Sequence, residues 1–392
     1  MNNIRKDYNK ASRLSRRGNN EEALKIYERD YDEHPELFLK GHRISFAWAI
    51  YNVHIKNFTD EIDLIEATEF ITELIDQADS NKVKYCPYTL SVLKVIKLLY
   101  DRDEFYNLLY WLEKINPDLL SQKRGTFNSK PTKSVMEKFY DRATKTYLEC
   151  EDYEICLEMS KKALESLDEF TNGSDIWYRW RIAKSLKELN QNQEALKYLK
   201  EVSKVKKDWF VQKEFVDNYL SLDMRDEALE YISKAILAKG SSNYKVNLYS
   251  LIYHLLKQSE PEIALKHAQL YYLLKIDTSS VMDEDIEDLM IDESELNQKQ
   301  LEREISDYWL EYKFKDQELQ YGTIVKFFEE KNFGFIKNQD DESVFFHKSQ
   351  FNGDHIYIGQ AVSFYTEKRF DKSKNKDSIN AVNIQGDNYD LS

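Results

Sequence analysis

Hydrophobic residues in the first 318 positions recur every three or four residues, and charged residues fill many of the positions between them. This spacing predicts amphipathic helices that each bury one face. From Tyr321 onward the pattern changes to short runs of β-branched and aromatic residues separated by turns. Runs of this kind are typical of strands. We therefore expect a long helical region followed by a small domain built from a sheet.

The distribution of glycine and proline supports the same boundary. Five of the ten glycines follow residue 320, whereas all five prolines precede residue 262. The long first region is instead rich in Leu, Lys, Glu and Ala, which favour helices.

The helical region contains an internal repeat. A polar turn followed by Glu-Ala-Leu or a close variant places a small residue at Cys156, Ala195, Ala228 and Ala264, at intervals of 39, 33 and 36 residues. The same pattern occurs near the N-terminus at Ala23. A period near 34 residues with this layout predicts two-helix solenoid units. The small residue lets the two helices of a unit approach closely, and larger apolar residues fill the groove to the next unit.

These positions resemble the tetratricopeptide repeat (TPR) family. The resemblance covers residues 1–40 and 135–275. The helices between residues 41 and 130 deviate from the pattern, and we expect them to stack in the same solenoid. The resemblance implies a surface for a protein or peptide partner. The matching residues are Gly18, Ala23, Tyr27 and Pro35 in one unit, Ala183, Ala195 and Tyr198 in another, Tyr219 and Ala228 in a third, and Leu255 and Ala264 in a fourth.

Three segments around the repeats have their own character. Residues 121–134 carry four positive charges and no acid, and are expected to form a flexible connection. Residues 276–300 are acidic, and their favoured interpretation is a solvated linker. The alternative is a segment that packs on, or competes for, a basic surface. Residues 301–319 predict one amphipathic helix that caps the solenoid or docks the final module.

The last part of the chain predicts a small closed barrel. Five short apolar runs in about 65 residues suit a five-stranded barrel of the OB type. Side chains alternate along a strand, so Phe333 and Phe335 are expected on one face and Gly334 and Ile336 on the other. The expected domains are therefore a solenoid at 1–275, an acidic linker plus amphipathic helix at 276–319, a barrel at 320–386 and a tail at 387–392.

This barrel sequence resembles the cold-shock domain, a member of the OB group. The first nucleic-acid motif of that family matches residues 331–336 (KNFGFI), and the second matches residues 344–347 (VFFH). The resemblance implies that single-stranded RNA or DNA stacks its bases on exposed rings of these two strands. Transferred position by position, the stacking set is Phe327, Phe333, Phe335, Phe345 and His347, with Lys331 beside the nucleic-acid backbone.

The sequence departs from the family pattern at several of these positions. Lys326 replaces the usual Trp, Lys348 replaces the aromatic residue that usually follows His347, and Asn332 replaces a Gly. Asparagine tolerates left-handed backbone angles better than most residues. Because lysines stand where rings are usual, we expect weaker and more salt-dependent binding, with Lys326 and Lys348 as phosphate contacts.

Charge is concentrated in one part of the chain. The formal net charge is −14 and the pI is near 5.2, which argues against a wholly basic nucleic-acid binder. Residues 277–320 carry 15 acidic and 4 basic side chains, whereas residues 321–386 carry nine of each. The barrel module should therefore repel phosphate less than the total charge suggests.

Nothing in the sequence predicts catalysis, a cofactor or a metal site. It contains no P-loop, GxSxG, HExxH or paired CxxC, and its seven histidines are scattered. The three cysteines form no close pair, which favours a reducing compartment. No secretory signal and no run of about 18 apolar residues is present, so a cytoplasmic protein without a membrane span is expected.

The favoured function is an adaptor or regulator that holds single-stranded RNA or DNA on the barrel and a protein partner on the solenoid. The alternative is a protein-interaction scaffold or peptide-sensing regulator whose barrel is a docking module and binds no nucleic acid. A third hypothesis, a nuclease in residues 41–130, has less support. The sequence does not predict the oligomeric state.

Overall fold

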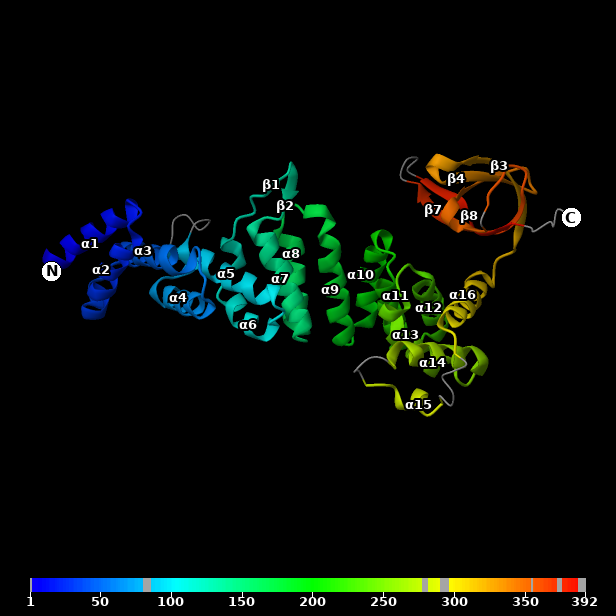
Figure 1. Cartoon of the computed structure of the whole chain (residues 1–392), viewed down its shortest axis with the longest axis horizontal. Coiled ribbons are helices and arrows are strands. Elements are labelled where there is room, and N and C mark those ends of the chain that lie inside the picture. The colour runs from blue at the N-terminus through cyan, green and yellow to red at the C-terminus, as the bar shows by residue number, and fades with distance from the viewer. Residues whose placement is uncertain are drawn as a thin grey trace. The chain divides into compact units, whose positions relative to one another are not determined.

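The computed structural model describes residues 2–79, 86–276, 281–289, 296–353, 355–371 and 376–386 (Figure 1). The chain divides into two compact units, Met1–Ala228 and Leu229–Ser392. The predicted fold class is confirmed, because a helical repeat region precedes a small closed barrel of five main strands.

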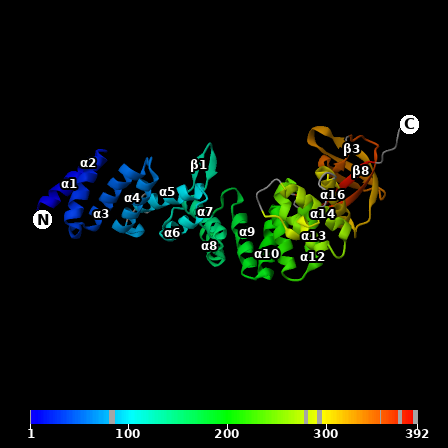
Figure 2. The same ribbon diagram turned by 60° about the horizontal axis from the view of Figure 1, so that its bottom comes forward.

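The first unit is a succession of helices in which each packs on its neighbours in the sequence (Figures 1 and 2). Helix α3 continues into a short π-helix, Tyr51–Ile55. The helices are α1 (Asn2–Arg16), α2 (Asn20–Glu33), α3 (Lys40–Ile50), α4 (Glu61–Leu74), α5 (Pro87–Asp101), α6 (Phe105–Glu113), α7 (Val135–Glu149), α8 (Tyr153–Ser166), α9 (Asp175–Glu188), α10 (Asn192–Val205) and α11 (Trp209–Leu220).

Five of the described turns between paired helices share one geometry. A single residue takes a left-handed φ in each: Gly18, Asp103, Glu151, Asn190 and Asp223. The N–H that follows it donates to the carbonyl five residues earlier, at N···O distances of 2.7–3.0 Å. This bond satisfies a carbonyl at the end of the first helix and reverses the chain for the second. The same local turn therefore recurs in four of the repeat units, and it also joins α5 and α6, where the sequence deviates from the repeat.

The small residues of the repeat are buried between helices, as predicted. Cys156, Ala195 and Ala228 have no exposed surface, and neither has Ala23, while Ala264 is 1 % exposed. A larger side chain at these positions would separate the two helices of a unit.

The prediction for residues 121–134 is wrong. The segment forms an antiparallel β-hairpin, β1 (Gly125–Phe127) and β2 (Lys130–Thr132), in which Phe127 lies opposite Lys130. Its turn residues Asn128 and Ser129 both have positive φ, at 47° and 61°, which a two-residue turn compatible with strand twist requires.

The second unit begins with helices that lead to the barrel. They are the end of α12 (Arg225–Leu237), then α13 (Val246–Leu256), α14 (Pro261–Lys275), the short α15 (Glu284–Glu287) and α16 (Gln298–Phe314). Helix α16 packs on α14, where the Trp309 indole donates a hydrogen bond of 2.9 Å to Nε2 of the buried His267. Its last residue, Phe314, stacks on Tyr365 of the barrel with ring centroids 4.3 Å apart. The amphipathic helix thus contacts both the helical region and the final module.

The described part of the acidic segment is not a solvated linker. Asp283 accepts hydrogen bonds from Ser250 (2.6 Å) and His254 (2.8 Å) of α13, and Ile286 is fully buried. Asp285 pairs with Lys257 at 3.1 Å. Residues 281–289 therefore pack on α13 and α14 through both polar and apolar contacts. Residues 298–300 of the predicted linker belong to α16. Residues 277–280 and 290–295, and the tail from residue 387, lie outside the described residues.

The barrel is one sheet that closes on itself. Its strand order is β5-β4-β3-β7-β8-β6, and a pairing of β5 with β8 completes the circle. Its core consists of apolar side chains from β3, β4, β5, β7 and β8. The strands are β3 (Gln320–Phe328), β4 (Phe333–Asn338), β5 (Ser343–His347), β6 (Phe351–Asn352), β7 (Ala361–Asp371) and β8 (Lys376–Gly386).

Candidate nucleic-acid interface

An aromatic cluster covers the outer face of strands β4 and β5. Phe333, Phe335 and Phe345 are half-buried there, whereas their neighbours Ile336 and Phe346 are fully buried in the barrel core. The alternation predicted from the sequence is therefore confirmed for these three rings. We call Phe328, Phe333, Phe335 and Phe345 the ring face.

The rings of this face pack edge against face. Phe335 is nearly perpendicular to Phe333 (88°, centroids 6.0 Å) and to Phe345 (77°, centroids 5.8 Å). Phe333 and Phe345 are closer to parallel, at 32° and 5.5 Å. Edge-to-face packing is the preferred arrangement for aromatic rings. It holds the cluster in one conformation while leaving each ring partly exposed.

Gly334 makes the inner side of this arrangement possible. A Cβ at this position would lie 2.5 Å from the Lys326 carbonyl oxygen and 2.6 Å from the Phe346 ring. No side chain fits at these distances, so glycine is required by close packing. The missing side chain leaves room for the Phe346 ring, which stacks on the Phe327 ring at 6.1 Å with an interplanar angle of 8°.

The prediction that Phe327 lies on the outer face is wrong. Strand β3 has a bulge at Val325, because Ile324 pairs with Ile336 and Lys326 pairs with the preceding residue of β4. One extra residue reverses the side on which every later side chain points. Phe327 consequently packs against the barrel core.

The same bulge brings a residue that the sequence interpretation missed onto the ring face. Phe328 pairs with Phe333, is 44 % exposed, and places its ring 5.0 Å from the Phe333 ring. The two consecutive phenylalanines were visible in the sequence, but their sides depend on the bulge. Lys326 also lies on the outer side, opposite Phe335, and is exposed.

One end of the ring face is formed by His347 and the turns beside it. His347 is exposed, pairs with Phe333 across the strands, and its Nδ1 accepts a hydrogen bond from the Ser349 N–H at 3.2 Å. A backbone donor at Nδ1 leaves Nε2 as the protonated nitrogen of the neutral ring. Asn332 has a φ of 54°, in agreement with the left-handed conformation expected for it, and its carbonyl accepts from the Lys348 N–H at 2.8 Å.

Charge is polarised along the face. Lys331 and Lys348 are exposed on the two segments that this backbone bond joins, at the His347 end. At the other end, the β4–β5 turn carries acidic residues, and Lys337 there is paired with Asp341 at 2.7 Å. Phosphate is therefore disfavoured at the second end, whereas at the first end the two lysines are offset by the exposed Glu329 and Glu330 that precede Lys331.

The structure thus brings together every predicted site residue except Phe327: three rings, one histidine and three lysines lie on or beside one face. Described side chains of α16 contact the barrel on β7, at Tyr365 and Glu367. Among the described residues no group of three or more His, Cys, Asp or Glu side chains could hold a metal ion. The chemistry of the face is stacking and ion pairing.

Comparison with known proteins gives one match to a family and a distant structural likeness. Residues 320–386 match the family model described as the 'Cold-shock' DNA-binding domain. A solved structure entitled "Crystal Structure of P58(IPK) TPR Domain" aligns with 81 % of this chain and 99 % of its own at 11 % identity, with a TM-score of 0.21. No curated protein matches the sequence. No helix among the described residues is long and apolar enough to cross a membrane. The chain therefore combines a region of successive helix pairs with a terminal barrel, residues 320–386, that matches the cold-shock family model.

Proposed function

We propose that this protein binds single-stranded RNA or DNA on the ring face of its barrel and holds a protein partner on its helical repeats. The observation that carries the proposal is the cluster of four phenylalanine rings kept partly exposed on one face of the barrel. Apolar rings in water are costly unless a partner covers them. Nucleobases are suitable partners because every base has a flat π-face that stacks on an aromatic ring.

The energy of such binding is set by a few rings. Stacking on one aromatic side chain contributes about 1–3 kcal/mol per base. The planes of Phe333 and Phe345 are 32° apart, the smallest angle among the ring pairs of the cluster. Two bases stacked on these rings supply about 2–6 kcal/mol before ordering costs. Contacts from Lys326, Lys331 and Lys348 to phosphate add a term that weakens with salt. Binding independent of base identity is the expected result.

The test is a titration of fluorescent oligo-U and oligo-T with the full-length protein at two salt concentrations. Phe333→Ala/Phe335→Ala should weaken binding by about 2 kcal/mol or more, which is about 30-fold. Replacing the three lysines with alanine should reduce the magnitude of the slope of log K against log salt by about 2, because each phosphate contact contributes about 0.7 to that magnitude. Unchanged affinity in the ring variant would overturn the proposal.

The alternative function is a scaffold whose barrel contacts only proteins. It is favoured by exposed apolar side chains in the connection between β6 and β7, at Tyr357 (57 %) and Ile358 (68 %). The same titration separates the two functions. If the protein is only a scaffold, the wild type should bind oligo-U and oligo-T no more tightly than the Phe333→Ala/Phe335→Ala variant does. Replacing Tyr357 and Ile358 with serine should leave nucleic-acid affinity unchanged if the ring face is the site.

A further inference from the structure

The β1–β2 hairpin of the helical region is an exposed structural element that the proposed function does not use. In Figure 1 it projects from the helices of its own unit, beside α7 and α8. Phe127 and Lys130 flank its two-residue turn and lie directly opposite each other, so their side chains share one face of the hairpin. The positive φ angles of Asn128 and Ser129 give the turn a defined conformation.

The base of the hairpin is anchored, which matters because an isolated two-stranded hairpin is marginally stable. Arg124 pairs with Glu169 at 2.7 Å, in the connection between α8 and α9. Lys133 pairs with Asp141 of α7 at 2.7 Å, and neighbouring cations hold the pKa of that carboxyl below its usual range against the effect of its burial. Two of the four cations in the segment are therefore used to hold the hairpin.

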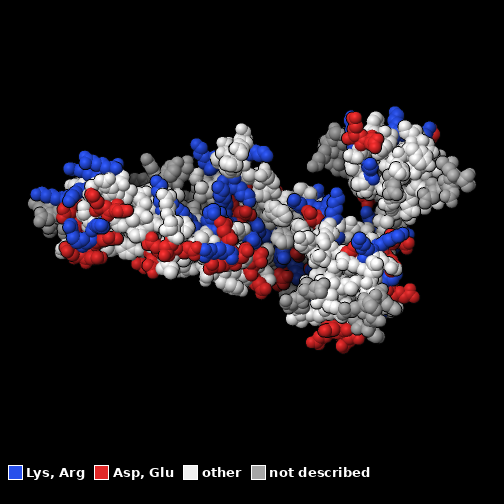
Figure 3. All heavy atoms as spheres, viewed as in Figure 1, with Lys and Arg blue, Asp and Glu red and all other residues white. Residues whose placement is uncertain are grey.

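The other two cations and the ring remain at the surface. Phe127 is 71 % exposed, and Lys123 and Lys130 are exposed and form no ion pair among the described residues. Residues 121–134 contain no Asp or Glu. Figure 3 shows basic side chains on both sides of the projecting hairpin. Glu169 and Asp141 lie at the base of the hairpin, where they pair with Arg124 and Lys133. At the tip, an aromatic ring and a cation on one face match the base and the phosphate of a nucleotide.

Other kinds of partner fit this tip less well. A peptide strand that extended the sheet would need free N–H groups along the edge, and Pro131 removes one from β2. A membrane surface is bound by a broad apolar face, and the described hairpin offers only one large exposed ring, that of Phe127. A single-stranded polyanion needs only a ring for stacking and cations for its phosphates.

We propose that the β1–β2 hairpin is a second contact for single-stranded nucleic acid, in which Phe127 stacks on a base and Lys123 and Lys130 bind phosphates. The choice of ligand rests on the proposed function of the barrel. When a strand that is long enough to reach both sites is bound at one of them, its binding to the other site is intramolecular. The overall affinity of such a strand therefore exceeds the affinity of either site alone. A short strand engages the barrel alone.

The experiment compares oligo-U of 8 and 40 nucleotides on the full-length protein. One OB-type barrel covers about 4–16 nucleotides, so the 8-mer reports the barrel. Phe127→Ala should weaken 40-mer binding at least about five-fold, the equivalent of one weak stacking contact. Lys123→Ala/Lys130→Ala should lower the salt slope for the 40-mer by about 1.4. Neither variant should change 8-mer binding.

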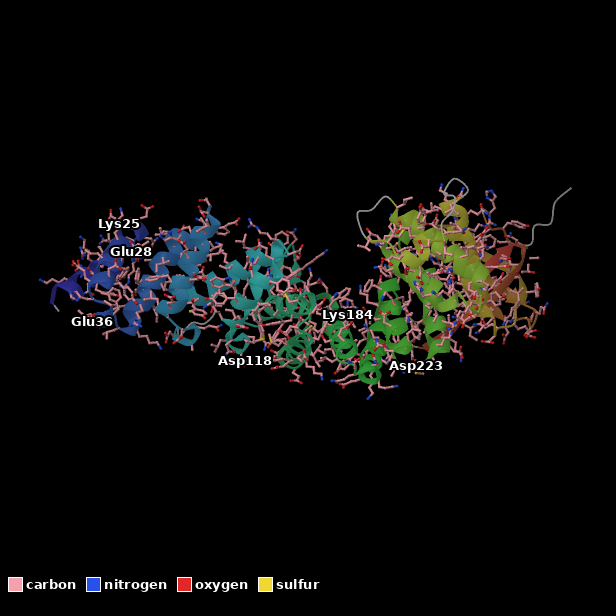
Figure 4. The ribbon with its side chains drawn as sticks, turned by 90° about the horizontal axis from the view of Figure 1, so that it is seen from below. Lys25, Glu28, Glu36, Asp118, Lys184 and Asp223 are labelled. Carbon is pink, nitrogen blue, oxygen red and sulfur yellow. The ribbon has the colours of Figure 1, made fainter. Side chains whose placement is uncertain are left out.

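A matched control removes the same charge elsewhere in the unit. Lys25, labelled on α2 in Figure 4, and Lys204 on α10 are both exposed, and Lys25→Ala/Lys204→Ala should keep the wild-type 40-mer slope. Circular dichroism verifies that all variants are folded. Wild-type binding of the 40-mer by both hairpin variants would overturn this inference while leaving the barrel site intact. A different outcome would reject the barrel site and support the hairpin. In that outcome the hairpin variants weaken 40-mer binding, whereas Phe333→Ala/Phe335→Ala has no effect on 8-mer binding.

Discussion

The bulge in β3 makes a prediction that separates two adjacent phenylalanines. Phe327 packs inside the barrel against the buried Phe346, and Phe328 lies outside on the ring face. Replacing Phe327 with alanine should destabilise the barrel and affect binding only through that loss. Replacing Phe328 with alanine should weaken nucleic-acid binding and leave the barrel nearly as stable as before.

The magnitudes follow from burial. Truncating a fully buried Phe costs about 3–5 kcal/mol, so the half-buried Phe327 should cost about 2 kcal/mol. Phe328 is 44 % exposed and touches Phe333 at its rim, so its truncation should cost at most about 1 kcal/mol of stability. As a stacking ring it should contribute about 1–3 kcal/mol to binding, or about 5- to 150-fold in affinity.

Hydrogen exchange of β4 and β5 peptides measures the stability of the barrel within the full-length chain, because these strands open only when the barrel unfolds. Anisotropy with an 8-nucleotide oligo-U measures binding under conditions in which both variants are folded. The opposite pattern, with Phe327→Ala impairing binding at full stability and Phe328→Ala having no effect on binding, would show that the bulge does not place the rings as described.

Three further predictions concern the framework that holds the two regions in shape. Burial lowers the pKa of His267 to about 4, whereas the unfolded chain protonates this residue near pH 6.5. The free energy of unfolding should therefore fall by about 3 kcal/mol as the pH drops from about 6.5 to about 4. In urea titrations a His267→Gln variant should lose that dependence. Gly334→Ala should destabilise the barrel by about 1–3 kcal/mol because its Cβ would meet the Phe346 ring, whereas Gly41→Ala, which has open space around it, should be neutral or stabilising in the same thermal melts. Burial acts to raise the pKa of Glu137, but hydrogen bonds from the α8–α9 connection hold this pKa below its usual value. Glu137→Gln should place an amide donor against those donors and lower the stability of the helical region by about 1–3 kcal/mol. Urea titrations measure this change, and an unchanged midpoint would contradict the geometry.

The sequence predicts those features of the site that depend on local periodicity. Strict alternation along β4 and β5 is sufficient to place Phe333, Phe335 and Phe345 outside, and Gly334 inside. The left-handed turn at Asn332 is likewise a local property of one residue type. These predictions needed no knowledge of how the strands pair.

Features that depend on pairing or on distant contacts could not be predicted in this way. The bulge at Val325 is defined by the register of β3 against β4, and alternation counted through it puts Phe327 on the wrong side. The hairpin at residues 125–132 has Ser129 in place of the usual glycine of a tight turn and a proline within its second strand, both of which argue against a strand. The acidic segment is held by hydrogen bonds that Ser250 and His254, about 30 residues earlier, donate to Asp283, and composition does not reveal such contacts.

The most direct test of the ring face as a base-stacking surface is photocrosslinking of the full-length protein to oligo-U, followed by mass spectrometry of the attached peptides. Aromatic side chains stacked on a base are the groups in closest contact with it. The account predicts crosslinks in the β4 and β5 peptides that contain Phe333 and Phe345, and their loss when both residues are replaced with alanine. Crosslinks confined to other parts of the barrel or of the chain, or crosslinks that persist in that variant, would contradict it.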